Sequence, residues 1–319
     1  MTDCLVIGEA LIDVVRRPGG ETTRHPGGSP MNVSVGIARL GRRVHLLTRF
    51  GDDTDGDTLR DYIESAGVML APGAVDSDAT SIAMASIDDE GSPAYHFDVN
   101  SSYVEPPTSP EKVAALLAKP PLHVHIGSIG AHLRPGSDTV CRWLKLLHPH
   151  STVSYDPNVR LSILGSAQSV IDDMQEILPF VDIVKASTED LEELHGEPVE
   201  PDDAAQYFLD RGVEFVAITM GAQGVKLYTP KESVEIPALS VQVVDSVGAG
   251  DAMMAALIDS LARISVLGDE RAGLTEISPQ MLTSVGQFAV TAAAITVSRA
   301  GANPPTRDEV NDLLANTQF

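Results

Sequence analysis

The strongest constraint on the fold is an alternation of short apolar strands with helical stretches. We expect strands at residues 122–126, 151–155, 181–184 and 214–219, separated by helices such as 136–147 and 168–178. This alternation is typical of a parallel sheet covered by helices on both faces. The sequence therefore predicts a three-layer α/β/α domain, and with 319 residues and 43% apolar content one domain over residues 1–319 can bury a sizeable core.

The first hundred residues contain two segments of a different kind. Helices are expected at 30–40 and 57–66, and strands at 4–8 and 44–50. In contrast, segments 11–25 and 80–99 each read as two extended pieces around a turn, near 18–20 and 88–93, which indicates hairpins. If the two hairpins pair, they form a small sheet outside the main one. We expect this sheet to be a lid.

Polar and glycine residues follow each predicted strand directly. Ligands of open parallel sheets bind beyond the carboxyl ends of the strands, so these residues are expected to gather at one rim. They are Gly8-Glu9, Gly127-Ser128, Asp156-Pro157-Asn158, Lys185-Ala186-Ser187 and Thr219-Met220-Gly221.

The segment VVDSVGAGDAMMAAL, residues 243–257, carries the first candidate chemistry. A helix that begins near Ala249 leaves N–H groups of residues 248–251 without intrahelical partners, which suits a phosphate. Asp251 in the first turn can then take a proton from an incoming hydroxyl. The segment alone is equally compatible with an ordinary helix start that Asp245 or Ser246 caps.

A second candidate segment is PGGSPMN, residues 26–32. Gly27 and Gly28 give a flexible joint before a helix, and the Asn32 amide can hydrogen-bond a hydroxylated ligand. The alternative is a loop with Pro30 near a helix start.

Composition narrows the classes of partner and the compartment. The formal net charge of −23 disfavours nucleic acid and membrane surfaces, because both carry negative charge. Cys4 and Cys141 belong to no disulfide framework or zinc ligand set, so we expect a reducing compartment, the cytoplasm. The first fifteen residues lack a basic region before their apolar run, and no secretory or membrane segment is expected.

Together, GGSPMNVSVGIARLG and DSVGAGDAMMAAL resemble the paired signatures of the PfkB, or ribokinase-like, carbohydrate kinases. The resemblance covers nearly the whole chain, and the GEALID start with the DPNVR segment is most similar to the fructokinase-like branch. It implies a ribokinase-like fold with a β lid and ATP-dependent phosphorylation of a sugar hydroxyl. A nucleoside, a keto-deoxy sugar acid, or sugar binding without catalysis on the same fold are the alternatives.

The resemblance also implies roles for individual residues. Asp251 resembles the catalytic base, and Gly248, Ala249 and Gly250 resemble the anion hole. The sugar-binding positions match Asp13, Gly27, Gly28 and Asn32, with Arg160 as a further candidate for substrate or phosphate that is otherwise a surface ion pair. The nucleotide-binding positions match Lys185, Ser187, Thr219, Gly221 and Gly224. Further implications are Mg²⁺, K⁺ near the Asp245 loop, and a homodimer through the lid.

Three segments depart from the family pattern. Ser187-Thr188-Glu189-Asp190 stands where Asn-x-x-Glu is usual, so Glu189 and Asp190 are expected to act on Mg²⁺ only through water. Residues 253–256, MMAA, replace the usual Phe and Gly residues, a change expected to alter packing. The lid segment Tyr95-His96-Phe97-Asp98 lacks a basic residue for a phosphorylated sugar, which favours an unphosphorylated substrate.

A pair of histidines is the best signal for a competing function, that of a metal-dependent hydrolase. His123 and His125 lie on one face of a predicted strand, as in some metal-dependent hydrolases. No further His or Asp ligand pattern accompanies them, so we interpret them as buried structural histidines.

Overall fold

A nine-stranded sheet forms the centre of the protein, whose computed structural model describes residues 3–16, 20, 22–87, 93–317 and 319. Its strand order is β15-β14-β13-β12-β11-β10-β1-β4-β6. The strands from β6 to β13 run parallel, whereas β14 and β15 are antiparallel to their neighbours. The bounds are β1 Cys4–Ile7, β4 Val44–Leu47, β6 Met69–Leu70, β10 His123–Gly127, β11 Thr152–Asp156, β12 Ile183–Ser187, β13 Phe215–Thr219, β14 Val225–Tyr228 and β15 Ser233–Ile236.

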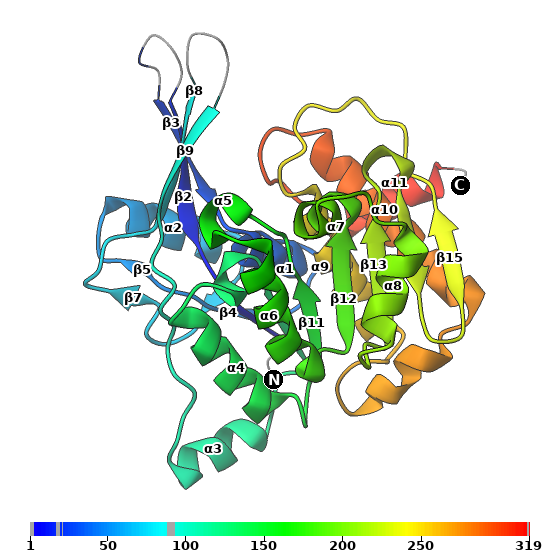
Figure 1. The fold of residues 1–319 in the computed structure, drawn as a ribbon, viewed down its shortest axis with the longest axis horizontal. Helices are drawn as coiled ribbons and strands as arrows, with labels where there is room; N and C mark the ends of the chain where they lie inside the picture. Colours follow the sequence, from blue (N-terminus) through cyan, green and yellow to red (C-terminus); the bar gives the residue numbers. More distant parts are fainter. Residues whose placement is uncertain (1–2, 17–19, 21, 88–92, 318) are drawn as a thin grey trace.

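Helices cover both faces of this sheet, so the predicted three-layer architecture is confirmed. In Figure 1, α4, α6, α7 and α8 lie in front of the sheet, and α1, α9, α10 and α11 lie behind it. The helices are α1 Ser29–Arg39, α2 Thr54–Ser65, α3 Pro110–Leu117, α4 Gly136–Leu147, α5 Leu161–Leu164, α6 Ala167–Ile177, α7 Thr188–His195, α8 Pro201–Leu209, α9 Ala249–Arg263, α10 Pro279–Val297 and α11 Arg307–Ala315, with short 3₁₀ helices at Ile129–Ala131, Leu178–Phe180, Gly221–Gln223 and Gly268–Glu276.

The side chains of each strand alternate between two buried cores. On β1, Cys4 and Val6 pack into the core beneath α1, α9 and α10. Leu5 and Ile7 point the other way, into the core beneath α4, α6 and α8. Because both faces are buried, the strands are mostly apolar, which is the pattern that made them recognisable.

A separate four-stranded sheet has the order β3-β2-β8-β9. It consists of β2 Leu11–Arg16, β3 Thr22–Gly27, β8 Ile82–Ile87 and β9 Pro93–Asp98, and it stands out from the main body in Figure 1. The two predicted hairpins thus lie in one sheet, joined by parallel pairing of β2 with β8. The predicted turn residues 18, 19 and 88–92 and the Tyr95 side chain lie outside the described part of the chain.

Two predicted boundaries are wrong in the N-terminal part. The strand expected over 44–50 ends at Leu47, and Phe50–Gly51 forms a separate β5 that pairs with β7, Val75–Asp76. The helix expected over 57–66 begins at Thr54, because Asp53 caps it by accepting a hydrogen bond from the Gly56 N–H at 2.8 Å. Both errors arise from contacts that local periodicity does not report.

The helix α10 is long and apolar enough to cross a membrane, by length and composition alone. However, 61% of the apolar window is buried inside the protein. Its buried side chains belong to the core behind the sheet, so it reads as the core helix of a globular domain.

Candidate active site

The helix α9 begins at Ala249, as expected from the sequence. Its N-cap is Gly248, which adopts φ 78° and offers no side-chain cap. A side chain is excluded there, since a Cβ would lie 2.7 Å from the Cβ of Ala302. The first-turn N–H groups of Gly250 and Asp251 have no intrahelical acceptor. The N–H of Ala249 differs, because it donates to the Ser246 carbonyl at 3.3 Å.

Asp245 shapes the loop before α9 and does not cap the helix. Its Oδ1 accepts a hydrogen bond from the Val247 N–H at 3.0 Å, and its Oδ2 accepts one from the Gly301 N–H at 2.9 Å. Asp245 and Asp251, the two carboxylates of segment 243–257, therefore lie in different environments.

Two side chains of α1 hold the carboxylate of Asp251. The Ser29 hydroxyl donates to Oδ1 at 2.6 Å, and the Asn32 amide donates to Oδ2 at 2.8 Å. The Oδ1 of Asn32 is buried without a partner among the described residues, which leaves it available to a ligand hydroxyl. Burial raises the pKa of Asp251, while the bonds from Ser29 and Asn32 and the charges of Lys185 and Arg160 oppose this rise.

The close approach of α1 and α9 brings Ser29 and Asn32 within hydrogen-bonding distance of Asp251. At the contact, a Cβ added to Gly36 would lie 2.7 Å from the Cβ of Ala255, so only glycine fits without moving the helices apart. Ala255, one of the small residues that follow Asp251, therefore helps to set the distance between α1 and α9.

Asp13 and the glycine pair lie on the lid side of Asp251. A Cβ at Gly27 would lie 2.0 Å from the Asp13 Oδ2, and one at Gly28, where φ is 109°, would lie 2.6 Å from the Glu9 carbonyl oxygen. Burial raises the pKa of Asp13 to about 6, against the opposing charges of His25 and Arg160. Asp13, Gly27, Gly28 and Asn32 thus lie together where β2 and β3 meet the start of α1, whereas Arg160 lies on the loop after β11.

A buried ion pair lies below the start of α9. The Lys185 Nζ is 2.8 Å from the Asp156 Oδ2, and both side chains are buried. The same ammonium lies 3.3 Å from the position of a Cβ on Gly250. Burial raises the pKa of Asp156 to about 6, although the Lys185 charge opposes it, and the second oxygen of Asp156 has no partner among the described residues.

Ser187 and Asp190 form a capping box at the start of α7. The Asp190 Oδ2 accepts from the Ser187 hydroxyl at 2.6 Å, and its Oδ1 accepts from the Val159 N–H at 2.8 Å. Asp190 thereby holds the loop that carries Arg160, whose Nη1 lies 4.0 Å from it. Glu189 is exposed beside this box. Asp190 therefore has a structural task that the sequence did not reveal.

The predicted nucleotide strand ends at Thr219 on β13, and Gly221 adopts φ 54° in the turn after it. Gly224, which the resemblance matches to the nucleotide-binding positions, also has a local role: a Cβ there would lie 2.1 Å from the Ile236 carbonyl oxygen on β15. Glycine is required at this position whether or not a nucleotide binds.

Sequence reasoning placed Glu9 and Asp156 at the strand-end rim without giving them a role, and it did not single out Ser29. Burial raises the pKa of Glu9 to about 7, and the charge of Asp251 acts in the same direction. Its Oε2 accepts from the Gly130 N–H at 3.0 Å. The signal available was position, because Asp156 ends β11 and Glu9 follows β1 after Gly8, both at the predicted rim.

His123 and His125 are structural. Both imidazoles are fully buried, and both hydrogen-bond the Ser154 hydroxyl, at 2.7 and 2.9 Å. Burial lowers the pKa of His123 to about 3 and that of His125 well below its usual range. No group of three or more His, Cys, Asp or Glu suited to a metal occurs among the described residues.

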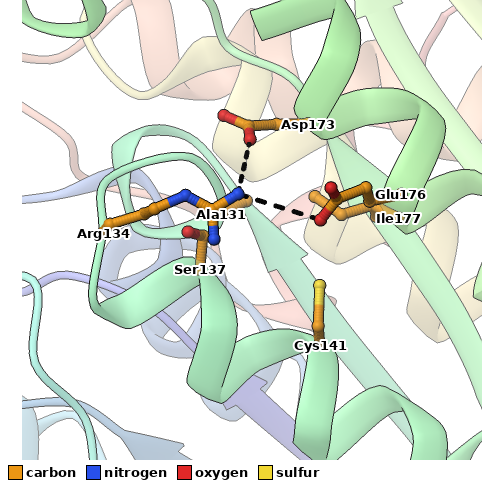
Figure 2. Close-up of a pocket in the computed structure, with 7 residues that line it drawn as sticks. All are labelled: Ala131, Arg134, Ser137, Cys141, Asp173, Glu176 and Ile177. Carbon is orange, nitrogen blue, oxygen red and sulfur yellow. Dashed lines mark hydrogen bonds and ion pairs between the residues drawn. The ribbon is translucent and has the colours of Figure 1, made fainter. Parts of the chain in front are cut away.

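Two surface pockets lie away from Asp251. Figure 2 shows the smaller one, where Arg134 reaches Asp173 at 3.5 Å and Glu176 at 3.8 Å beside Cys141. These side chains leave no space there for a ligand. A cleft of about 460 Å³ lies among α6, α7 and α8, and none of the predicted site residues lines it.

Comparison with known proteins agrees with this arrangement. The pfkB family carbohydrate kinase model matches residues 1–309. The chain is 30% identical to probable fructokinase-7 from Arabidopsis thaliana, over 98% of this chain and 92% of that protein. A crystal structure of fructokinase with bound ATP from Xylella fastidiosa is similar with a TM-score of 0.80 and 26% identity, over 99% of each chain.

Another similar structure is aminoimidazole riboside kinase from Salmonella enterica, complexed with aminoimidazole riboside and an ATP analogue. Its TM-score is 0.76 and its identity 25%, over 98% of this chain and 99% of that one. The match of the family model to residues 1–309, together with the similarity to fructokinases, identifies the class of enzyme. The chain belongs to the pfkB family of carbohydrate kinases and is a fructokinase-like sugar kinase.

Proposed function

We propose that this chain transfers the γ-phosphoryl group of ATP to a hydroxyl of a ketohexose, with fructose as the first candidate. The names of similar fructokinases and the ATP bound in one of them support both substrates. The observation that carries the proposal is the position of Asp251: it lies in the first turn of α9, beside unpaired N–H groups, and two α1 side chains orient it.

In the proposed mechanism, Asp251 accepts the proton of the sugar hydroxyl. The sugar oxygen forms a bond to the γ-phosphorus, the bond to the bridging oxygen breaks, and ADP leaves with that electron pair. The N–H groups at the start of α9 and the Lys185 ammonium stabilise charge on the transferred group. Asp251 then releases its proton to solvent.

The sugar is proposed to bind between the lid and the sheet. The Asp13 carboxylate accepts hydrogen bonds from two sugar hydroxyls, and the unpartnered Oδ1 of Asn32 accepts another. Glycine at positions 27 and 28 lets this loop lie against the Asp13 carboxylate and the Glu9 backbone, where a Cβ would clash. The charge of Arg160 acts on both Asp13 and Asp251, which supports its role as a further substrate contact.

The nucleotide is proposed to lie along the rim from Lys185 and Ser187 to Thr219, Gly221 and Gly224, and on to the Asp245 loop. Three valines of that loop are more than half exposed and offer an apolar surface for the base, namely Val243, Val244 and Val247. Apolar side chains exposed this far in a kinase loop are expected to be covered by a ligand.

A magnesium ion fits this site if phosphates and water supply most of its ligands. Mg²⁺ is usually held by one or two carboxylates with several waters. The carboxylates suited to such waters are Asp156, whose second oxygen is unpartnered, the exposed Glu189, and Asp190, whose oxygens also accept hydrogen bonds from Ser187 and Val159. When bound, the ion would neutralise charge on the phosphates.

K⁺ is proposed near Asp245. Both oxygens of that carboxylate accept backbone N–H groups, so carbonyl oxygens of the loop are left as ligands. Turnover in K⁺ compared with Na⁺ at equal ionic strength tests this, and equal rates would exclude it.

The small sheet is proposed to close over the sugar as a lid and to form a homodimer. Its outer strands, β3 and β9, each pair on one side only within the described residues, and unpaired edges favour association. Light scattering after size exclusion tests the dimer.

A cytoplasmic location is proposed because neither cysteine is in a disulfide, and imaging of a fluorescent fusion tests it.

The decisive experiment replaces Asp251 by Asn and measures ADP release with ketohexoses, aldoses, keto-deoxy sugar acids and nucleosides. The substitution keeps the shape and removes the proton acceptor, so we expect turnover to fall by about 10²- to 10⁴-fold. A variant with near wild-type turnover would contradict the assigned role. Sugar binding without ADP release by the wild type would instead indicate a regulator, and nucleoside turnover alone would identify the other branch.

A further inference from the structure

Ser29 lies at the point where two helix N-termini meet. It is the first residue of α1, is 7% exposed, and donates its hydroxyl hydrogen to the Asp251 Oδ1 at 2.6 Å. The two residues are 222 positions apart in the chain. A hydroxyl bound to a carboxylate at this distance forms a short, charge-assisted hydrogen bond.

The backbone around Ser29 fixes this contact. On one side stands Gly28 with φ 109°, and on the other stands Pro30, whose ring restricts the first turn. The ring of Pro30 packs on Gly8, where a Cβ would lie 2.3 Å from the Pro30 Cγ. Ser29 is therefore held in place before any ligand binds.

The surroundings of Asp251 explain why such a donor matters. The positive charges of Lys185 and Arg160 stabilise the ionised form of Asp251, whereas the carboxyl groups of Glu9 and Asp156 destabilise it. Burial raises the pKa of Asp251, and the hydrogen bond from Ser29 is the largest effect that opposes it.

We infer that Ser29 is a positioning residue for phosphoryl transfer, whose hydroxyl keeps Asp251 ionised and holds its carboxylate in one orientation. This inference rests on the proposed role of Asp251 as base. Each carboxylate oxygen accepts more than one hydrogen bond, so the sugar hydroxyl can reach Asp251 while Ser29 and Asn32 remain bound. Ser29 acts through Asp251.

The test compares Ser29→Ala with Ser29→Thr in steady-state kinetics with fructose and MgATP, or with the best acceptor of the panel. A hydrogen bond to a charged group is strong enough to shift a carboxyl pKa by about one unit. For Ser29→Ala we expect the acid limb of kcat/KM to move up by about one pH unit and kcat at neutral pH to fall roughly 10-fold. We expect the sugar KM to change less than about twofold, and Ser29→Thr, which keeps the hydroxyl, to restore the acid limb.

Ser34→Ala is the matched control. Ser34 is also a buried serine of α1, but its hydroxyl donates to the Met31 carbonyl at 2.7 Å and not to Asp251. Its pH profile should match the wild type, and thermal melts of all variants report folding. A shifted profile in Ser34→Ala equal to that of Ser29→Ala would overturn the inference, because the effect would then belong to α1 as a whole.

The double variant Ser29→Ala/Asp251→Asn separates this inference from the proposed function. If Asp251→Asn keeps only the expected residual turnover and adding Ser29→Ala lowers it no further, the two residues act as one unit. If Asp251→Asn is inactive while Ser29→Ala leaves the acid limb unmoved, the role of Ser29 is refuted and the base remains. If Asp251→Asn keeps full turnover, the proposed base is wrong and the Ser29 role falls with it.

Discussion

The contact between α1 and α9 allows a quantitative test of how packing supports the site, with Gly36→Ala as the perturbation. The added Cβ would lie 2.7 Å from the Cβ of Ala255. Carbon atoms in ordinary contact are about 3.5–4.0 Å apart, so the helices must separate by roughly 1 Å.

The expected loss of stability is small. Overpacking a core costs about 1–3 kcal/mol, and replacing glycine by alanine inside a helix returns about 1 kcal/mol. The free energy of unfolding should therefore fall by about 0–2 kcal/mol, which a domain with an ordinary stability of about 5–15 kcal/mol tolerates.

The expected loss of activity is larger. Ser29 and Asn32 on α1 hold Asp251 on α9 at 2.6 and 2.8 Å, so separating the helices displaces the base from its donors. Misplacement by about 1 Å costs on the order of 10²-fold in rate. Turnover should therefore fall about 100-fold in a protein that remains folded.

The assay is ADP release at saturating sugar, with urea unfolding followed by circular dichroism on the same samples. The matched control is Gly36→Ala/Ala255→Gly, which moves the methyl group from one helix to the other and restores the spacing. We expect the double variant to recover most of the turnover. Wild-type turnover in Gly36→Ala, or a double variant no faster than the single one, would refute the reasoning.

Two further predictions concern ionisation and buried polar groups. Because burial raises the pKa of Asp13 to about 6, its carboxyl group is about 10% ionised at pH 5, and the KM for the sugar should rise about tenfold between pH 7 and pH 5. The Asp13→Asn variant should show a high KM at both pH values. A wild-type KM that is the same at both pH values would exclude this role. Ser154→Ala should cost about 1–3 kcal/mol for each imidazole nitrogen left unpaired, with kcat unchanged, as measured by urea unfolding and ADP release. Since the folded-state pKa of His123 is about 3 and that of unfolded histidine about 6.5, the unfolded state binds the extra proton first, and the histidine contribution to stability should be present above pH 6.5 and lost progressively toward pH 3. The assignment would be contradicted if the free energy of unfolding were constant between pH 6.5 and pH 3 in the wild type but varied over this range in Ser154→Ala.

Features that depend on local sequence were predictable. The start of α9 at Ala249 follows from a glycine-rich turn before an apolar run, and α4 spans 136–147 as expected, because helix ends and amphipathic spacing are short-range properties. The parallel sheet was also readable, since strands buried on both faces are apolar throughout. The same alternation placed His123 and His125 on one face, although their partner Ser154 comes from the next strand.

Features that depend on pairing between distant segments were not predictable. The strand expected over 44–50 breaks at Thr48 and Arg49, because β5 pairs with β7 and leaves the main sheet. Asp190 is predicted from the resemblance to act on Mg²⁺ through water, and the sequence did not show that it also caps α7 and accepts a hydrogen bond from the Val159 N–H. Gly224 is predicted to lie at the nucleotide site, and the sequence did not show that the backbone of β15 also requires glycine there.

The sequence by itself determined the architecture, the strand-end rim and the two signature segments, and with them the class of chemistry. Only the tertiary structure decided which groups touch Asp251, how Lys185 is neutralised by Asp156, and why α1 and α9 approach so closely. The physical reason is range: periodicity and helix capping act over a few residues, whereas the pKa and orientation of a buried carboxylate depend on side chains that packing brings from more than 200 residues away.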